Sequence, residues 1–342
     1  MAIALRSLRQ CLARSLALIA AALLVAGCGP QVQERGGGQY TPVLEPGVAI
    51  MADGRELPVS RWYPEGDPEA ILLGVHGFND YRRAWQVVGD DLRSRGIATY
   101  AYDQRGFGAT EHAGIWAGTE RLVRDLATVA ALLHQHYPDT PIFIAGESMG
   151  GAVTLVTHQR HPDLPIAGTL LLAPAVWSRD HMPWYQRAGL WIASQVAPDR
   201  RLSGSGVEVR PSDNREMLRE LARDPLVQRG SRVDALNGLS NLMDRAQEAI
   251  PDYRGRTLIL YGEQDEIIPR APTCRMFQRL PAPERWRAVL YAEGYHMLTR
   301  DLQGDVVRGD IGDWVLDPDG PLSSGEETDL DGRLGAFCRR HL

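Results

Sequence analysis

Residues 141–153 read Pro-Ile-Phe-Ile-Ala-Gly-Glu-Ser-Met-Gly-Gly-Ala-Val. The first five are an apolar run of the kind that forms a buried strand, and a helical pattern begins near Gly151. Between the two stands a Gly-x-Ser-x-Gly motif, from Gly146 to Gly150, whose serine is Ser148. A strand that leads into this motif and then into a helix is the setting of a catalytic serine. The stretch therefore predicts a parallel α/β fold and a nucleophile together.

The glycines of this motif serve a steric purpose. The turn from strand to helix is tight, and a Cβ at Gly146 or Gly150 would clash within it. The turn presents Ser148 at the N-terminus of the helix, where the helix dipole favours developing negative charge. A purely structural turn is the alternative, and the position between strand and helix favours catalysis.

A serine needs a base, and the composition narrows the choice. The chain has no lysine, since all 37 of its Lys+Arg residues are arginine. A Ser–Lys dyad, a Schiff base and a lysine-containing phosphate loop are therefore excluded, which leaves nine histidines. His296 is the candidate because it follows the last predicted strand and comes after the serine, as in the chain order Ser…Asp…His of the α/β-hydrolases. His76 precedes the serine and stands where backbone geometry matters.

The third member of a catalytic triad is a carboxylate that orients the histidine and stabilises its charged form. The predicted strand that ends at Tyr261 leads into Gly262-Glu263-Gln264-Asp265. Asp265 is the candidate because a triad acid belongs at the carboxyl end of the strand preceding the histidine. Glu263 and Glu266 flank it and are the alternatives.

An oxyanion hole is expected from two backbone N–H groups. One belongs to the residue after the nucleophile, Met149, and the other to the loop after the third predicted strand, His76-Gly77-Phe78-Asn79-Asp80, which makes Phe78 the second donor. The stretch 103–108, Asp-Gln-Arg-Gly-Phe-Gly, is interpreted as a structural turn beside the site. We expect Asp103 and Arg105 in it to make buried polar contacts.

Outward from the motif, strand-like and helix-like periods alternate along the chain, which indicates a mostly parallel sheet flanked by helices. A leading antiparallel pair is expected around Asp53-Gly54. The predicted strands are 48–51, 57–62, 71–75, 97–102, 141–145, 168–173, 257–261 and 288–291, and the predicted helices are 85–95, 119–137 and 152–161.

Residues 175–250 interrupt this alternation and are predicted to form a helical cap inserted between the sixth and seventh main strands. Trp177, Trp184 and Trp191 lie in its first part. These side chains either face the active site or a membrane surface, or they pack the cap onto the core, and the sequence leaves both open.

The first 27 residues have the composition of a signal peptide. They contain three arginines and no acid, followed by an apolar run from Leu16 to Ala26 that is too short to span a bilayer. The run ends in Val-Ala-Gly-Cys28, which resembles the lipobox of bacterial lipoproteins. This resemblance implies that Cys28 becomes the acylated first residue of a mature protein in the cell envelope, on the periplasmic face of the outer membrane. An ordinary or uncleaved leader is the alternative.

Residues 28–46, with three glycines in the middle, are predicted to be a flexible tether, and residues 47–342 to be the hydrolase domain with its cap. Without residues 1–27 the net charge falls from −6 to about −9, so no nucleic-acid surface is expected. No metal-type cysteine spacing is present. Cys274 and Cys338 remain in the mature chain, and whether they form a disulfide is left open.

Five motifs stand together in residues 45–300: His76-Gly77, Asp103-x-Arg105-Gly106-x-Gly108, Gly146-x-Ser148-Met149-Gly150-Gly151, Gly262-x-x-Asp265 and Tyr295-His296. With these motifs the chain resembles the monoacylglycerol lipase/lysophospholipase branch of the α/β-hydrolases, a group also called serine aminopeptidase S33-like. The chain departs from that branch at Phe78-Asn79-Asp80 and throughout the cap.

The resemblance implies a serine esterase that needs no cofactor or metal and cleaves lipid esters such as monoacylglycerols or lysophospholipids through an acyl-enzyme. The same triad could instead serve an aminopeptidase, a thioesterase or a perhydrolase. A non-catalytic envelope protein that binds lipids is the alternative outside enzymes, and it predicts a broken triad. Every triad member is present: Ser148, Asp265 and His296.

Overall fold

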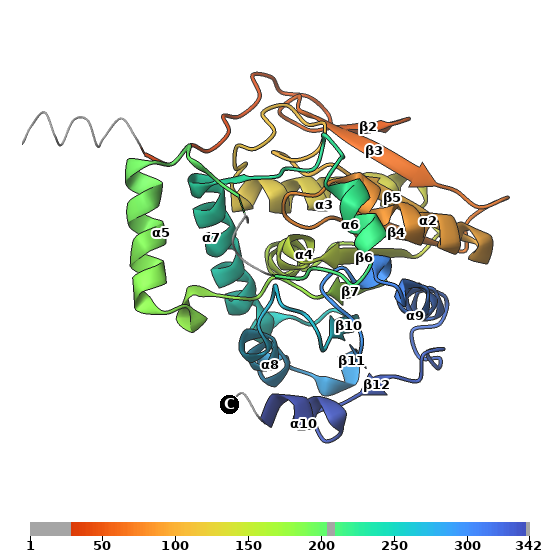
Figure 1. Cartoon of the computed structure of the whole chain (residues 1–342). Helices are drawn as coiled ribbons and strands as arrows, with labels where there is room; N and C mark the ends of the chain where they lie inside the picture. Colours follow the sequence, from red (N-terminus) through yellow and green to blue (C-terminus); the bar gives the residue numbers. More distant parts are fainter. Residues whose placement is uncertain (1–28, 204–208, 340–342) are drawn as a thin grey trace, which may run out of the picture.

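Six apolar runs form the parallel centre of a ten-stranded sheet in the computed structural model of the chain (Figure 1). The order across the sheet is β1-β2-β3-β5-β4-β6-β7-β10-β11-β12. Five of the six central strands are buried along their whole length, which explains why they read as continuous apolar runs. All six were predicted from the sequence. They are β4 (Ala70–Val75), β5 (Ile97–Tyr102), β6 (Ile142–Glu147), β7 (Gly168–Leu172), β10 (Thr257–Gly262) and β11 (Trp286–Tyr291).

The structure describes residues 29–203 and 209–339. The predicted leader 1–27 and the predicted lipidation residue Cys28 lie outside them. Within the described residues, none of the helices combines the length and the apolar character that crossing a bilayer requires.

Antiparallel strands extend the sheet at both edges. β2 (Val48–Ile50) and β3 (Glu56–Trp62) form the predicted hairpin, and β3 pairs with β5. Two short edge strands were not predicted: β1 (Val43–Glu45) beside β2 and β12 (Glu327–Thr328) beside β11. Because β1 belongs to the sheet, the folded part of the chain begins before residue 47.

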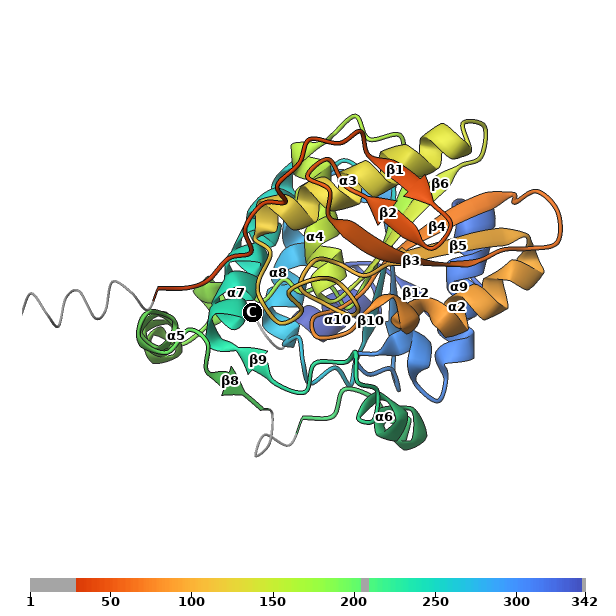
Figure 2. The same cartoon turned by 90° about the horizontal axis from the view of Figure 1, so that it is seen from above.

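Helices cover both faces of the sheet, and each layer encloses its own apolar core (Figure 2). The helices of the larger core are α3 (Thr119–His136), α4 (Met149–Arg160), α7 (Val233–Ala249), α8 (Arg270–Arg279) and α10 (Arg333–Arg339), and those of the opposite face are α2 (Gln86–Leu92) and α9 (Gly304–Leu316). Short 3₁₀ helices are η1 (Arg82–Trp85), η2 (Arg93–Arg95), η3 (Arg179–His181), η4 (Ile250–Asp252), η5 (Pro283–Arg285) and η6 (Leu298–Arg300).

Residues 173–256 connect β7 to β10, and the cap within this stretch is shorter than the predicted range 175–250. It contains α5 (Trp184–Val196), α6 (Arg215–Leu221) and the two-stranded pair of β8 (Arg201–Leu202) and β9 (Ser231–Arg232). Helix α7 falls within the predicted range 175–250, but its apolar stripe belongs to the larger core. The cap therefore ends before α7.

The three tryptophans of the insertion do not have the same surroundings, so one of them fits packing onto the core and two fit an outward-facing surface. Trp177 is partly buried and packs against the larger core, as a structural role requires. Trp184 and Trp191 on α5 are 77% and 63% exposed, and Tyr185 and Ile192 beside them are also exposed. Helix α5, which lies at the edge of the molecule in Figure 1, therefore exposes several apolar side chains.

The segment before β1 differs from the flexible tether that its glycines suggest. Gln33 is buried: its backbone N–H donates to the carbonyl of Trp116 over 2.9 Å and its side-chain amide to that of Ile115, also over 2.9 Å. Gln31 donates its backbone N–H to Asp234 in α7. These contacts hold the segment against the domain, because polar groups that leave water are retained where they find partners.

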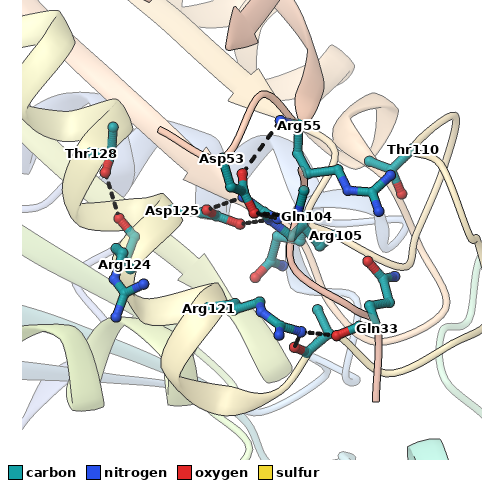
Figure 3. A network of polar contacts seen from close by, with 12 residues as sticks. Gln33, Asp53, Arg55, Gln104, Arg105, Thr110, Arg121, Arg124, Asp125 and Thr128 are labelled. Carbon is teal, nitrogen blue, oxygen red and sulfur yellow. Dashed lines mark hydrogen bonds and ion pairs between the residues drawn. The ribbon is translucent and has the colours of Figure 1, made fainter. Parts of the chain in front are cut away.

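The turn after β5 makes the buried polar contacts that were expected of it. The Arg105 guanidinium lies between two carboxylates: it donates to Asp53 over 2.6 and 2.8 Å and to Asp125 over 2.6 and 3.0 Å (Figure 3). This network ties the β2–β3 turn to helix α3. Asp103 accepts hydrogen bonds from the backbone N–H groups of Arg82 and Ala109.

A disulfide joins Cys274 in α8 to Cys338 in α10, whose Cα atoms lie 5.4 Å apart. Both cysteines are buried in the larger core. The sequence left open whether these two cysteines are bonded, and the structure shows that they are. The bond links α10 to α8 and so to the body of the domain.

Candidate active site

The nucleophile elbow lies between β6 and α4. Ser148 has φ 53° and ψ −114°, a backbone conformation that a residue with a side chain adopts only where its surroundings enforce it. The enforcement is steric. A Cβ on Gly150 would lie 2.0 Å from the carbonyl oxygen of Val75, and one on Gly146 would lie 2.6 Å from the backbone of Gly150. The close approach of β6, α4 and β4 thus requires both glycines.

Backbone hydrogen bonds hold Ser148 in this conformation. Its N–H donates to the carbonyl of Leu172 at the end of β7 over 2.9 Å, and its carbonyl accepts from Ala175 over 2.8 Å. Helix α4 begins at the next residue, Met149, so the N–H of Met149 is one of the first-turn donors without a partner inside the helix. The elbow thus offers a nucleophile and an adjacent N–H.

Asp265 and His296 meet although 31 positions separate them. Nδ1 of His296 lies 2.8 Å from Oδ2 of Asp265, and both side chains are buried. The other oxygen, Oδ1, accepts the backbone N–H groups of Ile267 and Ile268 over 2.7 and 3.0 Å. The carboxylate is therefore fixed before it meets the imidazole, and it holds the proton of His296 on Nδ1, which leaves Nε2 as the basic atom.

The charges around His296 set its basicity. Burial lowers the pKa of His296, but the nearby Asp265 carboxylate, its hydrogen bond and the Glu147 carboxylate together raise it by more, so the pKa lies above the usual 6.5. The imidazolium that forms when the base accepts a proton is therefore stabilised.

The two alternative acids are engaged elsewhere. Glu263 forms an ion pair with Arg333 over 2.6 Å, and Glu266 accepts the backbone N–H of Arg210 over 2.7 Å. Of the three carboxylates considered from the sequence, Asp265 is the one that the structure brings to His296.

The predicted oxyanion loop lies against the nucleophile. A Cβ on Gly77 would stand 3.4 Å from Cβ of Ser148, so the backbone that leads into Phe78 passes beside the serine. Nε2 of His76 accepts the N–H of Gln104 over 2.9 Å, while its Nδ1 lies 2.8 Å from the carbonyl oxygen of Gly77. Burial lowers the pKa of His76. His76 is therefore a neutral support of this loop.

The inserted segment is hydrogen-bonded to two of the loops that carry predicted site residues. In the oxyanion loop, Asn79 donates its side-chain amide to Ser231 over 2.8 Å and accepts the N–H of Gln228 over 3.0 Å. In the loop after His296, the carbonyl of Arg300 accepts the side-chain amide of Asn214 over 3.0 Å. The cap is thus bonded directly to loops that carry site residues.

Sequence reasoning missed three charged residues that surround these loops: Asp80, Glu147 and Arg300. Each stands within four positions of a residue that was singled out, and that proximity was the available signal. Within residues 29–203 and 209–339, no group of three or more His, Cys, Asp or Glu side chains is placed to hold a metal ion. The chemistry that the described residues offer is nucleophilic attack by a serine with a histidine base.

Comparison with known proteins identifies the family of the chain. The family model described as serine aminopeptidase, S33 matches residues 66–303. Monoglyceride lipase of Mus musculus is 25% identical over 282 residues, 81% of this chain and 92% of that protein. Monoacylglycerol lipase of Mycolicibacterium smegmatis is 24% identical over 260 residues, 75% of this chain and 91% of that protein.

The fold is likewise that of solved hydrolases. A soluble variant of monoglyceride lipase from Saccharomyces cerevisiae, solved in complex with a substrate analog, superimposes with a TM-score of 0.65 at 19% identity, over 84% of this chain and 97% of that one. The region matched by the family model contains Ser148, Asp265 and His296. The chain has the α/β-hydrolase fold and belongs to the serine aminopeptidase S33 family.

Proposed function

We propose that the protein is a serine esterase that cleaves carboxylic esters of lipids, of the monoacylglycerol or lysophospholipid type, through an acyl-enzyme intermediate. The observation that carries this proposal is the buried 2.8 Å contact of Asp265 with His296, at the same end of the sheet as the strained elbow of Ser148. A carboxylate that orients a histidine, at the end of the sheet that also carries a half-buried elbow serine, is an arrangement for acyl transfer.

In the proposed mechanism, His296 removes the proton of Ser148 through Nε2 while the serine Oγ attacks the ester carbonyl. The backbone N–H groups of Phe78 and Met149 donate to the oxyanion of the tetrahedral intermediate, and Asp265 stabilises the imidazolium. His296 then gives its proton to the leaving alcohol. Water activated by the same histidine releases the acid and restores the serine.

Two observations support a lipid substrate. Several curated relatives that match most of this chain are named monoglyceride or monoacylglycerol lipases. In addition, the exposed Trp184 and Trp191 of α5 give the molecule an aromatic face of the kind that settles at a membrane interface.

We further propose that the enzyme is anchored in the bacterial cell envelope through acylated Cys28, on the periplasmic face of the outer membrane. The basic, apolar and small-residue segments before Cys28 support this proposal. So does the course of the chain, because the described residues begin beside α5 in both views (Figures 1 and 2). Mass spectrometry of the protein from a bacterial membrane should find a diacylglyceryl group on Cys28, and an unmodified Cys28 would contradict the anchor.

The esterase proposal is tested with Ser148→Ala. This variant should lose hydrolysis of p-nitrophenyl esters and labelling by a fluorophosphonate probe, and it should retain the unfolding transition of the wild type. Ser178→Ala, a buried serine outside the elbow, is the matched control and should keep activity. Full activity of Ser148→Ala would overturn the proposal.

The substrate class is tested with a panel of monoacylglycerols, lysophospholipids, acyl thioesters and peptides of graded size. We expect the highest kcat/KM for a lipid ester. A panel in which peptides or thioesters exceed both lipid classes would assign the same triad to an aminopeptidase or a thioesterase instead.

A further inference from the structure

A buried arginine joins three of the four segments that carry the proposed site residues. Arg300, in the histidine loop, donates from Nη1 to Asp80 over 2.7 Å and from Nη2 to the two oxygens of Glu147 over 3.0 and 3.1 Å. Asp80 belongs to the oxyanion loop, and Glu147 directly precedes Ser148. One guanidinium thus bridges segments that are 153 and 220 positions apart from it.

All three side chains are buried, with 9% exposure for Arg300, 6% for Asp80 and 4% for Glu147. The free energy needed to remove two charges from water usually exceeds the attraction between them in the interior. A buried ionic cluster is therefore weak evidence for stability. The cluster is stronger evidence for a role in positioning the loops. The planar guanidinium donates in fixed directions, so each loop is placed relative to the same rigid group.

The network also acts electrostatically on His296, the proposed base. The charged groups that act on His296 are the carboxylate of Asp265 from the loop after β10, that of Glu147 from β6, and the guanidinium of Arg300 from η6. Asp80 faces Arg300 from the oxyanion loop. Glu147 favours the charged imidazole and Arg300 opposes it, so the two residues act on His296 with opposite signs.

We propose that Arg300 and Glu147 are positioning residues, which hold nucleophile, base and oxyanion loop in register for the proposed ester hydrolysis. This inference rests on the proposed function. It adds a consequence for His296, because Glu147 and Arg300 act on it with opposite signs. Removal of either residue should shift the proton affinity of His296 in the direction set by the charge that is lost.

The test measures the proton affinity of His296 directly, by NMR titration of histidines labelled with ¹³C in the full chain. The signal is assigned by its absence in His296→Asn. Glu147→Gln should lower the pKa of His296, because a carboxylate that favours the imidazolium is removed, while the amide oxygen can still accept from Arg300. Arg300→Gln should raise that pKa, because a positive neighbour is removed.

The kinetic readout separates geometry from charge. We expect Arg300→Gln to lower kcat/KM toward p-nitrophenyl esters by about 100-fold, the order of loss for a small misplacement of catalytic groups. Arg300→Lys keeps the charge but cannot donate in the same two directions, so it should leave the pKa of His296 close to that of the wild type and still lower kcat.

Asp125→Asn is the matched control. Asp125, in helix α3, is also buried and pairs with a buried arginine, Arg105, in the turn after β5. This variant should destabilise the fold without moving the titration of His296. If Glu147→Gln and Arg300→Gln leave that titration unmoved, or move it in the same direction, the inference is overturned. The titration does not require turnover, so this outcome is distinct from a failure of the esterase assignment, which Ser148→Ala reports.

Discussion

Asp265 reaches His296 with one carboxylate oxygen while two backbone N–H groups hold the other, so the imidazole is oriented by a carboxylate that is itself immobile. The arrangement has a consequence for pH dependence. A general base must be neutral, and the pKa of His296 is raised above 6.5, because the combined effects of Asp265 and Glu147 exceed the opposite effect of burial. We therefore expect kcat/KM to be low at pH 6 and to rise through a limb centred above pH 6.5. A profile of kcat/KM against pH, recorded at constant ionic strength, measures this limb. A limb centred below pH 6 would contradict the prediction.

The choice of acid gives a second prediction. Asp265→Asn should lower kcat by about four orders of magnitude, because the amide no longer holds the imidazole in the required tautomer. Glu263→Gln and Glu266→Gln alter the neighbouring carboxylates, which have other partners, and should retain kcat within about threefold. Steady-state kinetics on one p-nitrophenyl ester compares the three variants. A larger loss in Glu263→Gln than in Asp265→Asn would reassign the acid.

The parts of the site that the sequence predicts are those encoded locally. The elbow needs only a strand, two glycines and a helix, and residues 141–153 contain all of these in order. Likewise, Asp265 and His296 were found because each directly follows a recognisable buried strand. The carboxyl ends of adjacent parallel strands meet at one edge of a sheet, so their position in the sequence predicts their proximity in space.

The remaining features depend on contacts between distant segments. Gln33 lies in a Gly-rich stretch that reads as a tether, and its burial follows from carbonyl groups more than 80 positions away. Helix α7 has an apolar stripe that predicts a helix but does not say whether the stripe faces a cap or a core. The network of Arg300 joins three loops at separations that no local pattern encodes.

Packing at the elbow yields a third prediction. In Gly150→Ala the new Cβ would meet the backbone of Val75 at 2.0 Å, and neither β4 nor α4 can move away without loss of core packing. We expect a destabilisation of about 3 kcal/mol or more, together with loss of activity. Gly189→Ala, on the outer side of α5 where nothing lies within 4 Å, is the control and should stabilise the protein by about 0.5–1 kcal/mol. Chemical unfolding measures both, and equal stabilities would contradict the steric account.

The disulfide between Cys274 and Cys338 closes a loop across 64 positions. In the chain-entropy description, a cross-link of this span stabilises the folded state by about 4 kcal/mol. The oxidised protein should therefore unfold at a higher urea concentration than the same protein with reductant. Mass spectrometry without reduction should recover the two cysteine-containing peptides as one species. Coincident unfolding curves would show that the disulfide contributes nothing to the stability of the folded state.

The exposed face of α5 gives the last prediction. Trp184 and Trp191 are mostly exposed, and burying an aromatic side chain contributes about 1.5–3 kcal/mol. If this face enters the membrane interface, the double variant Trp184→Ser, Trp191→Ser should raise KM by about 100-fold or more for a long-chain monoacylglycerol presented in phosphatidylethanolamine–phosphatidylglycerol vesicles. Its kcat/KM for soluble p-nitrophenyl acetate should not change. Leu302→Ser removes another side chain that is 69% exposed, outside α5, and should alter neither value. An equal loss on both substrates would mean that these tryptophans support the fold rather than the approach to lipid.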